Sequence, residues 1–289
     1  MRAPDTLVAV TFGAMRALAA GLLLFAATCS AGGDPLTVGA RFAGMGGTGL
    51  TLADPWSVRM NPAGIAGLKA PAAGVLYQRH FLSEDLAQQG LAVAVPVGKG
   101  CFGIGADRFG YSLYNETRAS LAYAMRFGEG LRAAVQMDYL GVSLGGIYGS
   151  TAAFVAELGV QARISEQFWL GAHLFNPTRA KLGAVTEGNV VLDERVPTLL
   201  RAGLGWMVST KLTLTGEAEK DIDRPERFRF GVEYMPSKAL YLRTGISSGP
   251  VQGHFGVGVR ASKLEIDMAV VLRSQLGATP MINLNYRFK

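Results

Sequence analysis

Hydrophobic side chains recur at every second position along most of this chain. The stretch KLTLTGEAEKD (211–221) places Leu212 and Leu214 on one face and Glu217 and Glu219 on the other. The same alternation returns in two later stretches, RFRFGVEYM (227–235) and KLEIDMAVVL (263–272). A period of two is that of a β-strand with one apolar face, whereas an amphipathic helix repeats at about 3.6 residues. The pattern therefore predicts strands with two unlike faces.

Runs of this kind cover nearly all of the chain beyond residue 71. We count fourteen, at residues 72–81, 87–97, 101–109, 115–127, 131–142, 151–164, 168–177, 197–208, 211–220, 227–236, 239–246, 251–260, 263–272 and 280–288. Most are close to the roughly 9–11 residues that a tilted strand needs to cross a membrane. Their even number is typical of single-chain barrels of bacterial outer membranes.

The connections between these runs alternate in length. The longer ones are LSEDL (82–86), GYSLYN (110–115), SLGGIYGS (143–150), residues 178–196, DIDRPE (221–226) and SSGP (247–250). Between them come the short ones GKG (98–100), GEG (128–130), SEQ (165–167), Ser209–Thr210, Ser237–Lys238 and Ala261–Ser262. Outer-membrane barrels have short turns at one rim and longer loops at the other. The alternation therefore favours an up-and-down barrel.

The apolar face of these strands needs a cover. A soluble sheet with one solvent-exposed face also has a period of two, but it packs its apolar face against another layer. No helical segment beyond residue 71 is available for that, so lipid is the expected cover. We therefore predict an all-β fold, a transmembrane antiparallel up-and-down β-barrel of about fourteen strands with a short N-terminal plug segment, in the outer membrane of a Gram-negative bacterium.

The N-terminal region has the pattern of a secretory signal peptide. Arg16 precedes the apolar run ALAAGLLLFAAT (17–28), which is too short to cross a bilayer as a helix and ends in small residues. We expect cleavage after Ala31, whether translation starts at Met1 or Met15. The expected organisation is a signal peptide at 1–31, a plug segment at 32–71 and the barrel at 72–289.

Charge and cysteine content exclude some classes of protein. The formal net charge is +6, yet the basic residues form no block and alternate with apolar ones, so we expect no nucleic acid as a partner. Of the two cysteines, Cys29 lies within the expected signal peptide. Cys101 alone cannot form a disulfide within the chain.

Two short motifs resemble catalytic or nucleotide-binding signatures. Gly44, Gly46 and Gly49 fit G-x-G-x-x-G, but the prolines that follow interrupt the helix such a site requires. The stretch GVSLG (141–145) fits G-x-S-x-G, but another loop follows it instead of a helix. The three histidines are scattered and lack paired metal-ligand spacing. We therefore expect no enzyme, no cofactor and no metal site.

Charged residues on the strands form a separate candidate site. Their alternation with apolar residues directs them into the barrel lumen, where they are expected to form a network of salt bridges; a path for a substrate is the less favoured alternative. These lumen charges are Glu217, Glu219, Arg227, Arg229, Glu233, Arg243, Arg260, Glu265 and Asp267.

The segment before the first strand resembles a known family. GARFAGMGGTGLTLADPWSVRMNPAGIAGL (39–68) is similar to the N-terminal signature of the PorV/PorQ proteins, relatives of FadL-type outer-membrane barrels. The resemblance extends to HLFNPT (173–178), VPTLLRAGLGW (196–206), RFRFGVEYMPSKALYLRTGIS (227–247) and INLNYRF (282–288). It implies a fourteen-strand barrel whose N-terminal segment is tucked into the mouth or lumen. The residues that carry this plug are Gly44, Met45, Gly46, Gly47, Gly49, Asn61, Pro62 and Gly64.

The resemblance implies two classes of function. In the first, the protein is an interaction component of type IX secretion, with a secretion translocon or cargo protein as its partner. In the second, it is a FadL-like transporter or porin for hydrophobic small molecules, and a hydrophobic ligand occupies the lumen. In both cases outer-membrane lipid surrounds the barrel. The glycines at 44–49 would allow close packing against the inner wall, and Pro62 and Gly64 would shape the turn into the first strand.

Overall fold

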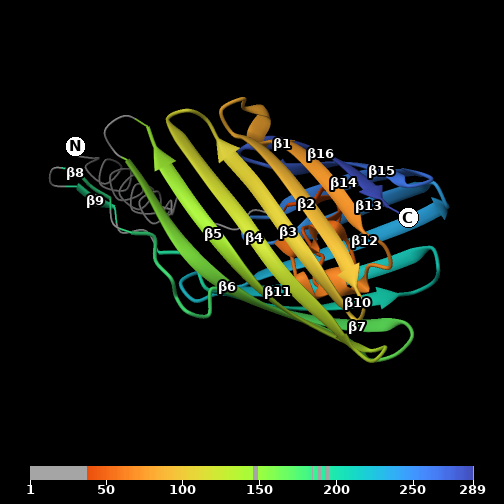
Figure 1. Cartoon of the computed structure of the whole chain (residues 1–289). Helices are drawn as coiled ribbons and strands as arrows, with labels where there is room; N and C mark the ends of the chain where they lie inside the picture. The colour runs from red at the N-terminus through yellow and green to blue at the C-terminus, as the bar shows by residue number, and fades with distance from the viewer. Residues whose placement is uncertain (1–37, 146–148, 184, 188–189, 193–194, 289) are drawn as a thin grey trace, which may run out of the picture. The chain divides into compact units, whose positions relative to one another are not determined.

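The computed structural model describes residues 38–145, 149–183, 185–187, 190–192 and 195–288, so the expected signal peptide lies outside the described residues. Within them, fourteen antiparallel strands close one barrel (Figure 1). The barrel strands are β1 (Ala72–Arg79), β2 (Ala87–Val97), β3 (Gly100–Gly110), β4 (Tyr114–Phe127), β5 (Leu131–Leu144), β6 (Gly149–Arg163), β7 (Phe168–Phe175), β10 (Leu199–Met207), β11 (Leu212–Asp221), β12 (Arg227–Ser237), β13 (Leu240–Ser247), β14 (Gln252–Ala261), β15 (Leu264–Arg273) and β16 (Gly277–Arg287). Strand β1 pairs with both β2 and β16, with Ala72 opposite Arg287, and this pairing closes the wall.

The predicted fold class is confirmed. Each barrel strand matches one of the fourteen expected runs, and the largest difference is at β16, which begins at Gly277 where we expected 280. The sequence did not reveal the small hairpin of β8 (Val185–Glu187) and β9 (Val190–Leu192) within the loop after β7. Strands of three residues are too short to establish an alternating pattern. No helix among the described residues is long and apolar enough to cross a membrane.

The two rims of the barrel differ as expected. The long-loop rim carries the connections 80–86, 111–113, 145–148, 176–198, 222–226, 248–251 and 274–276, and the short-turn rim carries 98–99, 128–130, 164–167, 208–211, 238–239 and 262–263. At β3–β6 the difference is smaller than the sequence suggested, because the strands extend into the expected loops. Leu144, for example, still pairs with Gly149. The loop 80–86 begins with the short helix η3 (His80–Leu82).

Side chains on the strands separate by face. On β15, Glu265 and Asp267 are buried toward the lumen, while Met268 and Leu272 point outward and are 48% and 44% exposed. Outward apolar residues of this kind recur on every barrel strand except β11, including Phe102, Leu121, Val135, Phe154, Phe230 and Leu284. The outer surface is therefore an apolar belt, as lipid contact requires.

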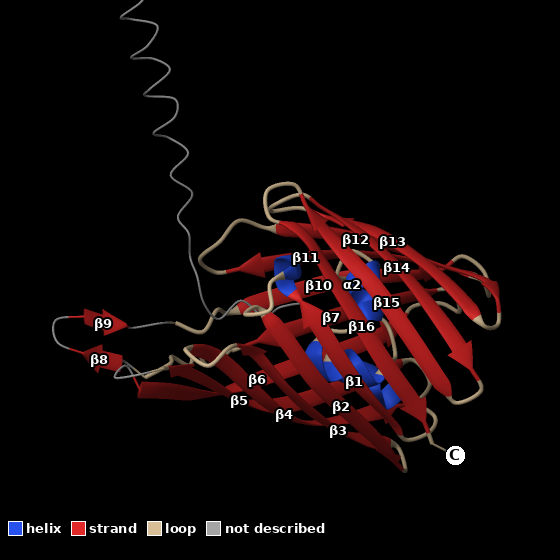
Figure 2. Ribbon diagram, turned by 90° about the horizontal axis from the view of Figure 1, so that it is seen from above, coloured by secondary structure: helices blue, strands red, loops and turns tan. Residues whose placement is uncertain are grey.

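The plug occupies the lumen (Figure 2). It consists of the short helix α2 (Ala40–Gly44) and two 3-10 helices, η1 (Pro55–Arg59) and η2 (Pro62–Gly67), joined by irregular backbone. Its largest side chains, including Phe42, Trp56 and Ile65, are buried against small inward residues of the wall such as Ala92 and Ala122. The larger hydrophobic cluster of the described residues therefore lies between plug and wall.

Substitution of Met268 by Arg is expected to destabilise the barrel by about 2–4 kcal/mol, because Met268 lies near the middle of β15 on the apolar belt. Leu272→Arg, on the same face but at the rim, is expected to cost about 1 kcal/mol or less, since arginine there reaches the interface. Urea unfolding of the protein folded into lipid vesicles measures both values. Equal costs at the two positions would contradict the placement of the belt.

Candidate functional site: the plugged lumen

Two similar caps shape the plug. The carboxylate of Asp54 accepts the backbone N–H of Trp56 at 3.0 Å, and the side-chain oxygen of Asn61 accepts that of Ala63 at 3.2 Å. Each cap is followed by proline at the first helical position. Asp and Asn are favoured caps, and proline fits this position because it has no N–H to satisfy. Asn61-Pro62 therefore starts helix η2, which is a correction to its expected role in a simple turn into β1.

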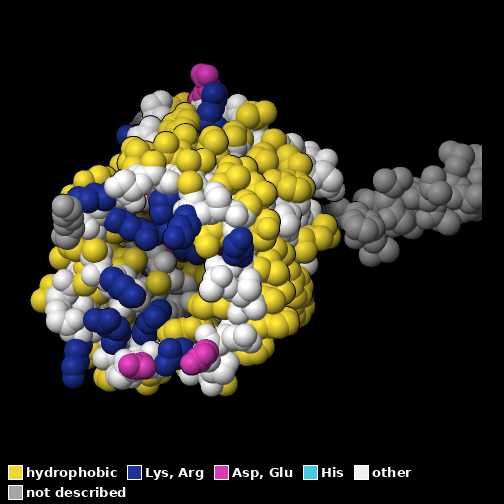
Figure 3. Space-filling view, turned by 90° about the vertical axis from the view of Figure 1, so that its right-hand side faces the viewer, with side chains coloured by type: hydrophobic (Ala, Val, Ile, Leu, Met, Phe, Trp, Pro, Cys, Tyr) yellow, Lys and Arg dark blue, Asp and Glu magenta, His cyan; other side chains and the backbone are white. Residues whose placement is uncertain are grey.

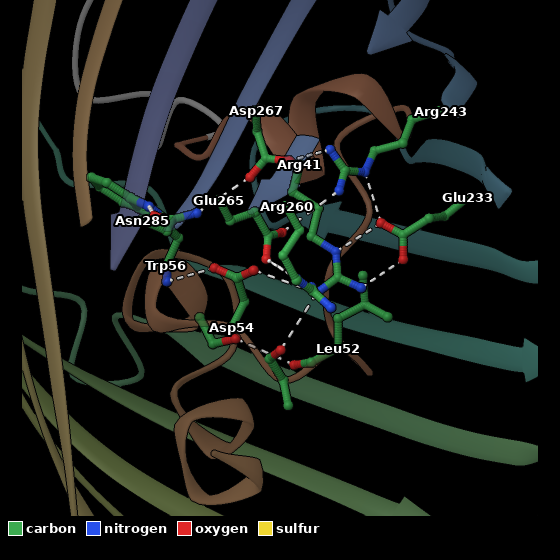
Figure 4. Close-up of polar contacts among 12 residues, drawn as sticks. Arg41, Leu52, Asp54, Trp56, Glu233, Arg243, Arg260, Glu265, Asp267 and Asn285 are labelled. Carbon is green, nitrogen blue, oxygen red and sulfur yellow. Dashed lines mark hydrogen bonds and ion pairs between the residues drawn. The ribbon is translucent and has the colours of Figure 1, made fainter. Parts of the chain in front are cut away.

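Arg41 on α2 ties the plug to the wall (Figure 4). Its Nε and Nη2 donate to the two carboxylate oxygens of Glu233 on β12 at 2.9 and 2.7 Å. Its Nη1 lies 3.4 Å from Oδ2 of Asp54. Two parallel N–H···O bonds fix the orientation of a guanidinium group. This pair therefore fixes the first turn of the plug against the barrel.

A second attachment lies at the chain reversal between α2 and η1. One carboxylate oxygen of Glu217 accepts the backbone N–H groups of Gly49 and Leu50 at 2.6 and 2.7 Å. The carbonyl oxygen of Leu50 in turn accepts the amide groups of Gln161 and Asn61, both at 2.8 Å. Backbone groups that lack partners in a helix or sheet are thus satisfied by wall side chains, as buried polar groups require.

A chain of hydrogen bonds connects the plug with the wall charges (Figure 4). The indole N–H of Trp56 donates to Asn285 at 2.8 Å, and Asn285 donates to Asp267 at 3.2 Å. Arg243 donates to Asp267 at 2.5 Å and to Glu233 at 2.7 Å. Since Glu233 also binds Arg41, the network is attached to the plug at two residues, Trp56 and Arg41.

The remaining lumen charges pair with one another. Glu265 binds Arg260 at 2.7 Å and Arg287 at 3.1 Å. Glu219 pairs with three arginines of neighbouring strands, Arg201, Arg229 and Arg227. The structure thus places the nine named residues on the inner wall, each within a network of ion pairs or bound to the plug: Glu217, Glu219, Arg227, Arg229, Glu233, Arg243, Arg260, Glu265 and Asp267. Their role as a structural network stays a prediction.

A second cluster of buried charges lies on β4–β7 and was not singled out from the sequence. Arg118 donates to Asp138 at 2.8 Å and also to Glu157, whose other oxygen lies 2.8 Å from Nε2 of His173. These residues are on four consecutive strands, and like the named charges each lies at an inward position of the alternating pattern within its strand. The period-two pattern was therefore a sufficient signal for them.

A further ion pair joins the plug to this side of the barrel. Nε of Arg59, at the end of η1, lies 2.6 Å from Oδ1 of Asp107 on β3. Arg59, like Arg41 and Asp54, could not be singled out from the sequence, because short helical turns and irregular segments have no period from which a face can be assigned.

Glycines permit the closest contacts of the plug, in a pattern that partly differs from our expectation. A Cβ on Gly44 would lie 3.0 Å from Cα of the wall residue Gly256, and one on Gly46 would lie 2.4 Å from the carbonyl oxygen of Phe230. These two glycines do pack against the wall. Gly49, in contrast, packs against the ring of Phe42 within the plug.

The other residues of the expected motif lie inside the plug as well. Gly64 packs against Leu52 and Ser57, and Gly47 has a φ of +78°, which favours glycine. Met45 is fully buried, and its carbonyl oxygen would lie 2.3 Å from a Cβ on the wall residue Gly231. The glycine motif therefore serves both the fold of the plug and its contact with the wall.

Two pockets lie between the plug and the long-loop rim. The first has Arg59 of the plug at its base together with the wall residues Asp107 and Arg118. Its upper wall is mostly apolar, with Leu140, Val142, Phe175, Leu182 and Val196. The second is more polar and lies beside Ala43, His80, His254, Val271 and Arg273.

Asn176 positions the loop that closes the first pocket. Its side-chain amide donates to the carbonyl of Val196 at 2.8 Å and its side-chain oxygen accepts the N–H of Ala180 at 2.7 Å. Asn176 has a φ of +54°, a conformation that asparagine adopts more readily than most residues. These contacts bring the apolar side chains of Leu182 and Val196 over the lumen, where both are buried.

Asp54 makes the attachment of the plug sensitive to pH. Burial raises the pKa of Asp54 from 3.8 to about 6, although Arg41 opposes the shift. Between these values the folded protein holds a proton that the unfolded chain has released, so the contribution of Asp54 to stability falls as pH rises from about 4 to about 6. Asp54→Asn mimics the protonated form and keeps the cap.

We expect Asp54→Asn to stabilise the protein by about 3 kcal/mol more at pH 7 than at pH 4, since two pKa units correspond to this energy. Urea unfolding in detergent micelles at the two pH values measures the difference. Asp85→Asn, in an exposed link, is the control. A stabilisation that does not change with pH would contradict the prediction.

Comparisons with known proteins identify relatives of the fold. No protein-family model matches the chain, and no curated protein matches its sequence. Among solved structures, the TodX monoaromatic hydrocarbon channel (deltaS2 mutant) matches with a TM-score of 0.68 at 12% identity, covering 89% of this chain and 100% of that one. The Ralstonia pickettii toluene transporter TbuX gives 0.62 at 14%, covering 87% and 98%. A Pseudomonas aeruginosa FadL homologue gives 0.61 at 11%, again covering 87% and 98%.

These structural matches support only one part of the family resemblance expected from the sequence. They support the FadL-like part of the resemblance but give no support to the more specific PorV/PorQ relationship or to a role in type IX secretion. At identities of 11–14% a structural likeness shows the fold alone. The chain therefore has the fold of the FadL-like barrels, a fourteen-strand wall closed around its own N-terminal segment.

Proposed function

We propose that this protein is an outer-membrane channel for apolar small molecules, and not an enzyme. The long-loop rim faces the cell exterior and the short-turn rim the periplasm, as is general for such barrels. The proposal agrees with the second of the two functions expected from the sequence. Two of the named proteins of the same fold, TodX and TbuX, are described as a monoaromatic hydrocarbon channel and a toluene transporter, which supports this choice.

The first pocket is the observation that carries the proposal. Apolar side chains from three elements line it, including Val142 of β5, Phe175 of β7 and Val196 of the loop 176–198. Sites for small molecules are typically concave and mostly apolar with a few polar groups that fix orientation. Here Arg59, Asp107 and Arg118 supply polar groups at the base, and Gln88, Glu116 and Thr117 also line the pocket.

The position of the pocket supports an entry site. It lies on the long-loop side of the plug, and Arg59, which borders it, belongs to η1. A ligand in this pocket therefore touches the segment that blocks the lumen. Passage then requires the plug to shift, because its side chains are buried against the wall. The ion pair of Arg59 with Asp107 is a contact between plug and wall, and both of its residues line the pocket.

Toluene binding tests the proposal. We expect the purified protein in an uncharged detergent to bind toluene saturably, and Val142→Asn to weaken binding about ten-fold, because an amide without a partner is costly beside an apolar ligand. Val271→Asn makes the same change in the second, more polar pocket and is expected to leave the affinity unchanged. Isothermal calorimetry gives the dissociation constants.

Transport is tested separately. Proteoliposomes containing the protein are expected to take up radiolabelled toluene faster than empty liposomes, and those with Val142→Asn to lose most of the increase. Absence of saturable toluene binding, or equal losses for Val142→Asn and Val271→Asn, would refute the assignment of the pocket. Recovery of the protein in a soluble fraction, without the heat-dependent gel mobility of a barrel, would refute the location.

A further inference from the structure

The short-turn rim is strongly basic (Figure 3). Its turns carry Lys99, Lys211, Lys238 and Lys263 against Glu129 and Glu166. Figure 3 views this rim face-on and shows Lys and Arg side chains around a hollow, with apolar side chains outside them. This hollow lies on the opposite side of the plug from the pocket proposed for apolar molecules, so its charge has no place in that function.

Three arginines concentrate the charge on one side of the hollow. Arg126 on β4 and Arg132 on β5 are directly opposite each other in the sheet. Arg163 on β6 is two residues beyond Gln161, the partner of Arg132, and is therefore its diagonal neighbour. Directly opposite positions bring Cβ atoms to roughly 5 Å, and like charges there are destabilising. The sheet thus holds three guanidinium groups together at an energetic cost.

Few acidic groups offset this charge. Arg163 pairs with the exposed Glu129 at 3.3 Å. Arg126 donates to the carbonyl oxygen of Gly98 at 3.2 Å, and Arg132 donates to the amide oxygen of Gln161 at 2.9 Å. Among the residues that the structure describes, no ion pair joins Arg126 or Arg132 to a carboxylate. The acids of the lumen, by contrast, are paired with arginines on other strands.

The surroundings of Arg132 form a built site. Its guanidinium stacks over the ring of Trp169 at 4.3 Å, which fixes its plane. A Cβ on Gly67, at the end of η2, would lie 2.6 Å from its Nη1, so Arg132 also borders the plug. Only one N–H donor of Arg132 is taken up by Gln161, so further donors of its guanidinium remain for a ligand beside Arg126. A preoriented guanidinium loses little entropy when it binds an anion.

The direction of these side chains defines the class of ligand. Arg126, Arg132 and Arg163 occupy the inward face of their strands, in phase with the buried Ala124, Ala134 and Gln161. Lipid headgroups surround the outside of a barrel and therefore do not meet this face. Arg132 lies between the wall residue Trp169 and the end of the plug, where a small molecule reaches it more readily than a folded protein surface does. A small soluble anion fits both conditions.

We propose that Arg126, Arg132 and Arg163 form a binding site for a small oxyanion, the phosphate or carboxylate group of a soluble molecule, at the short-turn mouth. Charge-assisted bonds from two or three guanidinium groups hold the anion, and its charge relieves their mutual repulsion. The site is independent of the channel function proposed above, because its residues do not line the apolar pocket.

Binding of inorganic phosphate to the full-length protein in an uncharged detergent tests the proposal. Phosphate is titrated against chloride at constant ionic strength, so that general screening stays the same. We expect saturable binding and a rise in the unfolding temperature. In the Arg126→Gln/Arg132→Gln double variant the affinity is expected to fall about ten-fold or more, since two charge-assisted donors are lost. Without phosphate this variant is expected to be at least as stable as the wild type.

The control removes the same charge elsewhere on the rim. Lys238→Gln/Lys263→Gln lowers the net charge equally but leaves the three arginines intact, and we expect it to bind phosphate as the wild type does. Should the double arginine variant fail to fold, Arg163→Gln alone is expected to give a smaller loss of affinity. Equal losses in the arginine and lysine variants would show a diffuse rim charge and overturn the site.

Two further arms identify the source of the anion. Phosphate affinity is expected to be equal in nanodiscs of phosphatidylcholine and of phosphatidylglycerol; a loss in phosphatidylglycerol would assign the site to a lipid headgroup instead. A hexaglutamate peptide is expected to compete with phosphate only weakly. If the peptide binds and phosphate does not, an acidic polypeptide is the ligand and the proposal fails. Absence of any saturable phosphate binding overturns it outright.

Discussion

Deletion of residues 44–68 is expected to turn a closed lumen into a conducting pore. These residues contain η1 and η2, and the side chains that fill the centre of the barrel, such as Met45, Trp56 and Ile65, are fully or almost fully buried there. A barrel of about eight strands is filled by the side chains of its own wall, whereas sixteen to eighteen strands leave an aqueous channel. With fourteen strands, the plug supplies most of the filling.

The barrel itself is expected to survive the deletion. Every barrel strand is hydrogen-bonded to two neighbours, and these ladders do not involve the plug. Wall charges that lose a partner, such as Glu233 without its plug contacts, are then solvated by water in the lumen. The deletion therefore removes the hydrophobic core between plug and wall without breaking the wall.

Planar bilayer recordings measure the result. We expect the intact protein to show almost no conductance and the deletion variant to show the stable steps of an open aqueous pore. The retained barrel is verified by heat-dependent gel mobility. Unchanged conductance in a folded variant would mean that residues 44–68 do not occlude the lumen, which would contradict both the plug and the passage proposed for apolar molecules.

The barrel wall could be predicted from the sequence because its signals are local. Alternation within each run gives the face of every side chain, as at Glu265 and Asp267 beside Ile266 and Met268. Turn lengths then give the order of the strands, since each strand pairs with the next one along the chain, apart from the closing pair and the pair across the long loop. The same reasoning would have found Arg118, Asp138 and Glu157, had it been applied to every strand.

The contacts of the plug could not be predicted in the same way. Arg41 meets Glu233 across a sequence separation of 192 residues, and Trp56 meets Asn285 across 229. No local pattern encodes which wall residue a plug residue reaches, because the plug is irregular. The resemblance to a family indicated that the segment enters the barrel, but the positions of its contacts depend on how the plug and the closed wall fit together in three dimensions.

The wall glycines show most clearly why the contacts of the plug could not be predicted from the sequence. Gly231, Gly245 and Gly256 lie within strands, where glycine is normally unfavourable because it has no side chain to pack. In the structure they leave room for the plug backbone at residues 44–46. Glycine within a strand can indicate a close backbone approach, but the approaching segment is identified only by the fold.

Substitution of Gly245 by Val is therefore expected to displace the plug without removing it. A Cβ at this position would lie 2.2 Å from the backbone nitrogen of Gly46 and 2.5 Å from the carbonyl carbon of Met45. The obstruction is backbone on both sides, so no side-chain rotation can relieve it. We expect a loss of about 3 kcal/mol or more in the free energy of plug docking, at the upper end of the cost of overpacking.

Conductance and limited proteolysis both report that loss. Gly245→Val is expected to show current steps approaching those of the deletion variant, and a protease is expected to cut the plug while the barrel stays intact. Gly253→Val, on the neighbouring strand β14, provides the matched control. A Cβ there would meet only the ring of Phe255 at 3.8 Å, so the lumen should stay closed. A closed, protease-resistant Gly245→Val variant would show that the plug backbone does not lie against β13, and the close packing of glycine on glycine that defines this lumen would have to be rejected.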